Sequence, residues 1–128
     1  MNSYDTALVI AGAIGSGSAV IHGVLTRWHI IDPLQRLAAA RIGTTVQRLV
    51  AVLLQFSTFN WFVGGLALLV AANAFGREAR LATGLLVGSS YLFAAVANLW
   101  ATRGRHPGWL PYATALGLIA YGLTKPVP

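Results

Sequence analysis

The uncharged stretch Leu49–Ala74, LVAVLLQFSTFNWFVGGLALLVAANA, decides the fold of this chain. A helix crosses roughly 30 Å of hydrocarbon with about 20 predominantly apolar residues. This stretch is therefore long enough to span a bilayer as one helix, with some tilt.

Three further apolar runs flank this stretch, at residues 7–26, 81–101 and 108–124. Pro111 falls in the first turn of the last run, where a helix tolerates proline. The links between the second, third and fourth runs are short, which makes consecutive helices antiparallel neighbours. The pattern predicts an all-α transmembrane four-helix bundle, built as a single domain over residues 1–128.

The composition agrees with a bilayer as the solvent. The chain of 128 residues is 56% hydrophobic and 9% charged, whereas roughly a quarter of the residues in a soluble domain are charged. A water-soluble protein of this size has too little interior to bury so much apolar surface. All nine basic residues lie between or beyond the apolar runs. We therefore expect these charges to flank the membrane, and we expect no nucleic-acid partner.

The segment between the first and second runs has its own pattern. Asp32-Pro33 is a helix-start signal, with Asp as the cap and Pro at the first helical position. Leu34, Leu37 and Ile42 then alternate with polar residues. This spacing predicts a short interfacial helix between the first and second spans.

The basic residues also predict an orientation. The two links on one side carry six of them, against three on the other side: Arg27, Arg36, Arg41, Arg48, Arg103 and Arg105, against Arg77, Arg80 and Lys125. The positive-inside rule then places both termini outside the cytoplasm. Trp28, Trp100 and Trp109 stand at helix ends on the inner side, where we expect them to anchor the helices at headgroup level.

One polar residue of each helix falls at a similar depth near the inner face: His22, Gln55, Asn98 and Tyr112. Polar groups in a membrane mark ligand pathways or bind helix to helix. Interhelical hydrogen bonding is the favoured interpretation, and a ligand pocket that opens inward is the alternative.

The three histidines are weak candidates for metal ligands. His22 and His29 lie seven residues apart and cannot both reach one metal without a break in the helix. A heme or metal held by one of them together with His106 is the alternative to hydrogen bonding. The chain has no cysteine and no carboxylate inside an apolar run, so we predict no metal, no cofactor and no catalytic residue.

Small residues recur every four positions in the first and third runs. They are Gly12, Gly15, Ser16, Ala19, Gly23, Gly84 and Gly88. Small residues at this spacing let helix backbones approach closely in lipid. We expect these faces to pack within the molecule, and one of them is also suited to a partner protein or a second copy.

Three stretches carry a resemblance to a known group: His22–Arg27 (HGVLTR), Arg48 with Leu54-Gln55, and Arg103–Trp109 (RGRHPGW). They resemble a group of small bacterial four-helix integral membrane proteins, in which the first helix has a His-Ser-x-Leu-Gly-Glu pattern and the second an Arg and a Trp-His pair. Gln55 stands here in place of the second histidine. The resemblance implies a bacterial inner-membrane location and brings no established activity.

Two functions follow as expectations. The first is a non-catalytic accessory subunit, or interaction partner, of a larger membrane complex, because the chain has almost no extramembrane mass and no catalytic or ion-coupling set. The second binds or transports a small hydrophobic molecule, a lipid or heme through the polar layer. An enzyme ranks third.

Overall fold

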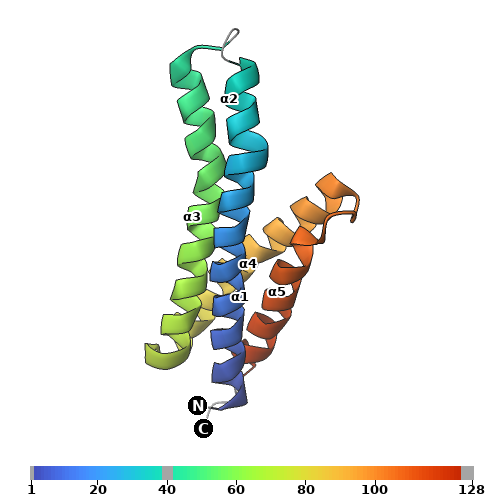
Figure 1. Cartoon of the computed structure of the whole chain (residues 1–128). Coiled ribbons are helices and arrows are strands. Elements are labelled where there is room, and N and C mark those ends of the chain that lie inside the picture. Colours follow the sequence, from blue (N-terminus) through green and yellow to red (C-terminus); the bar gives the residue numbers. More distant parts are fainter. Residues whose placement is uncertain (1, 39–41, 125–128) are drawn as a thin grey trace.

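The computed structural model describes residues 2–38 and 42–124, which form four helical rods (Figure 1). The first rod comprises α1, a π-helical turn η1 and α2, and the other three rods are α3, α4 and α5, the last preceded by a short 3-10 turn, η2. Their bounds are α1 Ser3–Thr26, η1 Arg27–Ile31, α2 Asp32–Ala38, α3 Thr44–Ala74, α4 Arg77–Thr102, η2 Pro107–Trp109 and α5 Leu110–Leu123.

Three rods are long and apolar enough to cross a membrane: Ser3–Leu37, Thr44–Ala74 and Arg77–Thr102. They contain the first three predicted spans. The fourth predicted span corresponds to η2 and α5, a shorter element. The prediction of an all-helical protein is confirmed, since the described residues include no strand.

The first rod continues without a break into α2, which does begin at the Asp32-Pro33 pair. Pro33 has no N–H, and its ring would clash with the carbonyl group four residues earlier in a regular α-helix. The chain avoids this clash through the π-helical turn, in which the N–H of Asp32 bonds to the carbonyl of Arg27, five residues back. The side chains of Arg27 and Asp32 also form an ion pair of 2.9 Å across the turn.

The rods form two hairpins that lean against each other (Figure 1). The first consists of α1–α2 and α3, and the second of α4 and α5. Helix α1 packs against both α3 and α5, while α4 packs against α5 and more loosely against α3. The described ends of the chain meet, because the rings of Tyr4 and Tyr121 stack with their centroids 5.0 Å apart.

The first hairpin extends well beyond the turn between α4 and α5 (Figure 1). At 1.5 Å per residue, the 35-residue rod Ser3–Leu37 is about 50 Å long, roughly 20 Å more than a hydrocarbon core. Its surplus consists of η1 and α2, and α2 lies beside the start of α3 (Figure 1). We call this projection, residues 32–38 and 44–53, the tip.

The core is built mainly of small side chains. Gly12 lies against Gly65, so a Cβ atom on Gly12 would come within 2.6 Å of the Gly65 carbonyl oxygen. A Cβ atom on Gly15 would overlap the hydroxyl of Tyr91. The other predicted packing residues also lie at contacts between helices: Ser16 bonds to the Phe62 carbonyl, Gly23 lies against Thr58, Gly84 against Leu123, Gly88 against Leu116 and Ile119, and Ala19 is fully buried.

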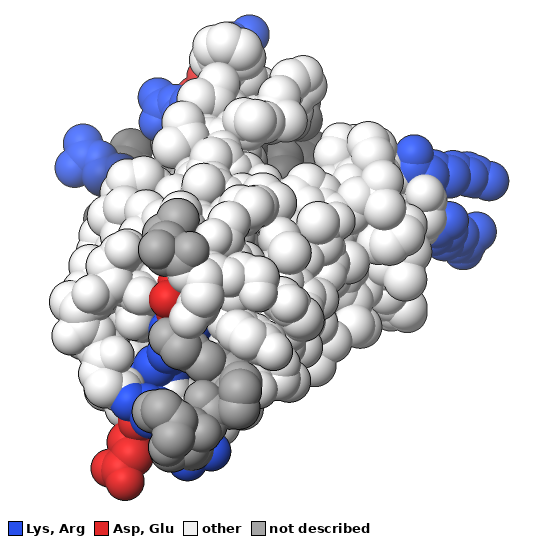
Figure 2. Space-filling view, turned by 90° about the horizontal axis from the view of Figure 1, so that it is seen from below, with Lys and Arg blue, Asp and Glu red and all other residues white. Residues whose placement is uncertain are grey.

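Many large apolar side chains point outward, although a few, such as Tyr91 and Leu68, are buried. Leu86 and Phe93 are each 73% exposed, and Trp100 is 82% exposed. Most of the surface visible from the end where the termini lie is uncharged, and charged side chains gather in a few places (Figure 2). Small residues inside and large apolar residues outside suit a molecule whose surroundings are themselves apolar.

Candidate functional site

The structure brings together three of the four residues of the predicted polar layer. His22 of α1, Asn98 of α4 and Tyr112 of α5 line one cleft of about 120 Å³ at the mouth between the two hairpins. We call this space the inner cleft. Its other lining residues are Ser18, Ile21, Leu25, His106, Gly108 and Pro111.

The side chain of His22 lies between the inner cleft and the core. Its Nε2 atom lies 3.2 Å from the hydroxyl of Thr26, one helical turn away. Its ring meets the edge of Trp61 with the ring centroids 4.8 Å apart. The imidazole is therefore held by its own helix and by α3.

An aromatic cluster continues from His22 across the core. The ring of Trp61 lies 4.8 Å from that of Tyr112, which lies 5.4 Å from that of Tyr91. The hydroxyl of Tyr91 donates a hydrogen bond of 3.1 Å to the carbonyl of Trp61. The buried hydroxyl of Tyr112 has no hydrogen-bond partner in the described part of the chain.

Gln55, the fourth residue of the predicted layer, lies outside the inner cleft. Its side-chain amide donates a hydrogen bond of 3.1 Å to the carbonyl of Gly23. It borders a shallow depression that is also lined by Arg27, Ile31, Ala51, Val52, Phe56 and Phe59. Counting residues gives the depth of a side chain along its helix. The direction in which it points turns by 100° with each residue, so two side chains at the same depth can point to different sides of the bundle.

Two of the three histidines, His22 and His106, line the inner cleft, whereas His29 does not. His106 caps the start of η2, because its Nδ1 atom accepts a hydrogen bond of 3.0 Å from the N–H of Gly108. Nε2 of the neutral ring then carries the hydrogen, so a metal or heme iron at Nε2 would require loss of the cap. His29 is exposed, with Nδ1 3.2 Å from the Leu25 carbonyl. Across residues 2–38 and 42–124, no three His, Asp or Glu side chains are grouped as metal ligands.

A larger groove runs between α3 and α4, where the two hairpins diverge. It has a volume of about 390 Å³, and we call it the α3–α4 groove. Its walls are Asn60, Val63, Gly64 and Ala67 of α3 and Thr83, Leu86, Val87, Ser89, Ser90 and Tyr91 of α4. Asn60 is exposed near the middle of α3. Neither Asn60 nor Ser90 forms a side-chain hydrogen bond with another described residue. Sequence reasoning did not predict that these two residues line one groove.

Sequence reasoning also missed a buried ion pair. Arg80, counted as a surface charge of the link, is 7% exposed and pairs with Asp5. The guanidinium also donates a hydrogen bond of 3.3 Å to the carbonyl of Gly122, so it joins α1, α4 and α5 at the end where the termini lie. The available signal was an acid and a base, each within the first turn of a helix that starts at this end.

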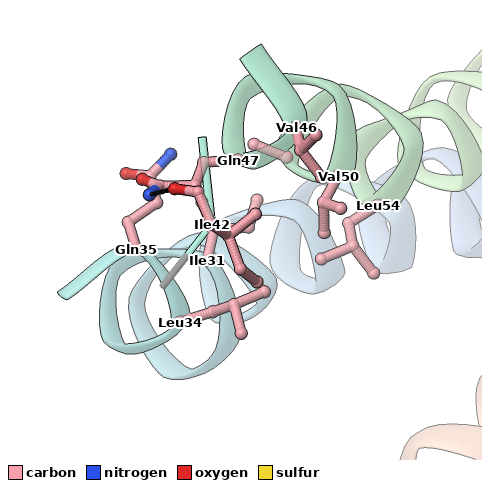
Figure 3. A pocket seen from close by; sticks show the side chains of 9 residues that line it. Ile31, Leu34, Gln35, Ile42, Val46, Gln47, Val50 and Leu54 are labelled. Carbon is pink, nitrogen blue, oxygen red and sulfur yellow. Dashed lines mark hydrogen bonds between the residues drawn. The ribbon is translucent and has the colours of Figure 1, made fainter. Parts of the chain in front are cut away.

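The tip contains a small apolar cleft of about 30 Å³ between α2 and α3 (Figure 3). Leu34, Val46 and Leu54 point into it from the two helices, and Gln47 donates a hydrogen bond of 2.7 Å to the carbonyl of Ile42 at its edge. This cleft is the packing seam of the hairpin rather than a chamber for a ligand.

The three predicted anchors lie near the inner cleft and its turn. Trp28 is 64% exposed within η1, Trp100 stands near the end of α4, and Trp109 is half-buried in η2. Arg41 and Lys125 of the predicted charge pattern lie outside the described residues. No family model, no curated protein and no solved structure matches this chain.

Proposed function

We propose that this protein is a small, non-catalytic accessory subunit of a larger membrane complex, and that the α3–α4 groove receives a transmembrane helix of its partner. The observation that carries the proposal is the amide of Asn60, exposed at the middle of a helix that is long enough to span the bilayer. Lipid chains offer no hydrogen bond, and an unsatisfied amide in hydrocarbon costs several kcal/mol by order of magnitude.

The shape of the groove also favours a helix as its occupant. Ala67 and Ser90 are small, so another helix backbone can approach closely between α3 and α4, next to the contact of Gly64 with Val87. The hydroxyl of Ser90 and the amide of Asn60 are then available to hydrogen-bond polar groups on that helix. A partner of this kind provides both the dispersion contacts and the hydrogen bonds that lipid cannot provide together.

The proposal includes a membrane setting. In it, η2 and α5 form a fourth crossing, so that the helices make a transmembrane bundle in a bacterial inner membrane with both termini outside the cytoplasm. Pairing of Arg80 with Asp5 removes one free cation from the outer end, which supports this orientation. Where α2 emerges, its exposed Leu37 and Arg36 suit an interfacial position among headgroups.

Photo-crosslinking tests the docking site. A photoreactive amino acid at Val63, on the rim of the groove, is expected to give one discrete adduct with a different membrane protein. The same amino acid at Ala120, which is exposed on α5, serves as the matched control and is expected to give none. Ala67→Phe fills the groove and is expected to abolish the Val63 adduct, whereas Ala120→Phe leaves it intact. An adduct with a second copy alone, or equal yields from both positions, would contradict the proposal.

A further inference from the structure

We infer that the inner cleft binds the phosphate head of one anionic phospholipid, which enters sideways from the bilayer. This site is separate from the α3–α4 groove. It rests on the membrane setting proposed above and not on the docking of a partner. The argument comes from the hydrogen bonds, the charges and the size of the cleft.

The first step is the donor that the cleft provides. Because Nδ1 of His106 accepts the N–H of Gly108, the ring presents Nε2–H as a donor at the cleft. The side-chain amide of Asn98 donates a hydrogen bond of 2.8 Å to the carbonyl of Ala94 and is oriented by it. A phosphate oxygen accepts from a donor such as His106 Nε2–H, while an apolar chain end does not.

The second step is charge. Arg103 and Arg105 lie in the same turn as His106, and both are exposed. Neither pairs with a carboxylate in the part of the chain that the structure describes. At the facing end of α1, Arg27 is neutralised by Asp32 at 2.9 Å. The turn that contributes His106 to the cleft is therefore basic, which complements a phosphate diester.

The third step is the apolar side of the cleft. Ile21 and Leu25 are 62% and 39% exposed on α1, next to Pro111 of α5. These side chains offer a surface along which an acyl chain can lie. The cleft, with a volume of about 120 Å³, has room for a phosphate group. The exposed Trp100 and the half-buried Trp109 lie on either side of the turn between α4 and α5. Tryptophans in such positions suit a turn at headgroup level.

Native mass spectrometry of the full chain, released from detergent, measures this site directly. We expect one tightly retained phosphatidylglycerol per chain, at several-fold higher occupancy than phosphatidylcholine with the same acyl chains. Arg105→Gln is expected to lower phosphatidylglycerol occupancy about fivefold, from roughly 1 kcal/mol per basic residue near a headgroup. Arg77→Gln removes an exposed arginine at the other end of α4 and is the matched control, with no expected change.

Two substitutions of His106 separate binding from folding. Asn and Asp both cap a helix start, so each preserves the acceptor for Gly108 N–H. His106→Asn removes the Nε2–H donor and is expected to weaken binding. His106→Asp adds a negative charge and is expected to abolish it, while far-UV circular dichroism stays unchanged.

Three results would overturn the inference. They are equal occupancy by both lipids, an equal loss of phosphatidylglycerol occupancy in Arg77→Gln and Arg105→Gln, and unchanged phosphatidylglycerol binding in His106→Asp. The last experiment adds inorganic phosphate as a competitor of the bound lipid. If it displaces the lipid at millimolar concentration and binds as tightly, the site recognises free phosphate and the assignment to a phospholipid is wrong.

Discussion

The guanidinium of Arg80 is enclosed by α1, α4 and α5. Replacing Arg80 is therefore the strongest single-residue test of the fold. The pair with Asp5 is shielded from water, with the side chains 9% and 14% exposed. Removing one member of a buried pair leaves the other uncompensated, at a cost of about 3–5 kcal/mol. We therefore expect Arg80→Met to destabilise the protein strongly in a denaturation series in mixed micelles followed by circular dichroism.

The double substitution Arg80→Met with Asp5→Asn is the control for this prediction. It removes both charges together, so it should cost clearly less than the sum of the two single changes. Additive losses would show that the two side chains do not interact.

A second residue-scale prediction concerns the closest approach of α1 and α3. A Cβ atom on Gly65 would come within 2.6 Å of the backbone oxygen of Gly12. Because a backbone atom cannot move aside cheaply, Gly65→Ala should destabilise the fold by about 1–3 kcal/mol. Gly17→Ala is the matched control, since no atom lies within 4 Å of its added Cβ and no loss is expected. The same micelle denaturation series compares the two variants.

At the scale of the elements, the start of η2 and α5 depends on one side-chain cap. The Nδ1 atom of His106 satisfies the N–H of Gly108, a group that a helix start otherwise leaves unpaired. His106→Ala should therefore cost about 1 kcal/mol of stability, and His106→Asn should restore most of it because Asn is a strong cap. Equal losses in both variants, measured by thermal unfolding, would show that the cap is unimportant.

The elements themselves were largely readable from sequence, and their relation to one another was not. Charged residues that follow the apolar runs, Arg77 and Glu78 after α3 and Arg103 and Arg105 after α4, marked the ends of these helices, because charged side chains are rare inside a long apolar helix. The Asp32-Pro33 pair coincides with the start of α2, but Asp32 has helical backbone angles and continues the first rod, so its predicted role as the cap of a separate helix is wrong. The pair gave no sign that a π-helical turn would join α2 to α1, since hydrogen-bond rerouting around a proline leaves no periodic pattern.

For the whole molecule, the membrane topology is the property to test first. The chain contains no cysteine, so single cysteines can be introduced without a background. Ser3→Cys, Gly76→Cys and Thr124→Cys should react with a membrane-impermeant maleimide added outside, while Arg105→Cys should react only after the membrane is opened. Labelling of Thr124→Cys together with Arg105→Cys would show that α5 does not cross.

The candidate sites show where sequence reasoning reaches its limit at this scale. Counting residues gave the depths of His22, Asn98 and Tyr112, and these residues do line one cleft. Gln55 shares their depth but faces Gly23 on another side of α1. Similarly, Asn60 of α3 and Ser90 of α4 line one groove, although neither sequence position indicates the other. Crossing angles between helices depend on the sum of many small contacts, which no single motif records.

The meeting of the chain ends has a consequence for biosynthesis. Helix α1 is synthesised before α5, yet Leu8 packs against Gly122, and the guanidinium that pairs with Asp5 also bonds to the Gly122 carbonyl. Helix α1 therefore has one face uncovered until α5 has been synthesised. A nascent chain arrested before residue 107 should remain sensitive to membrane proteases. A chain that also contains η2 and α5 should be resistant.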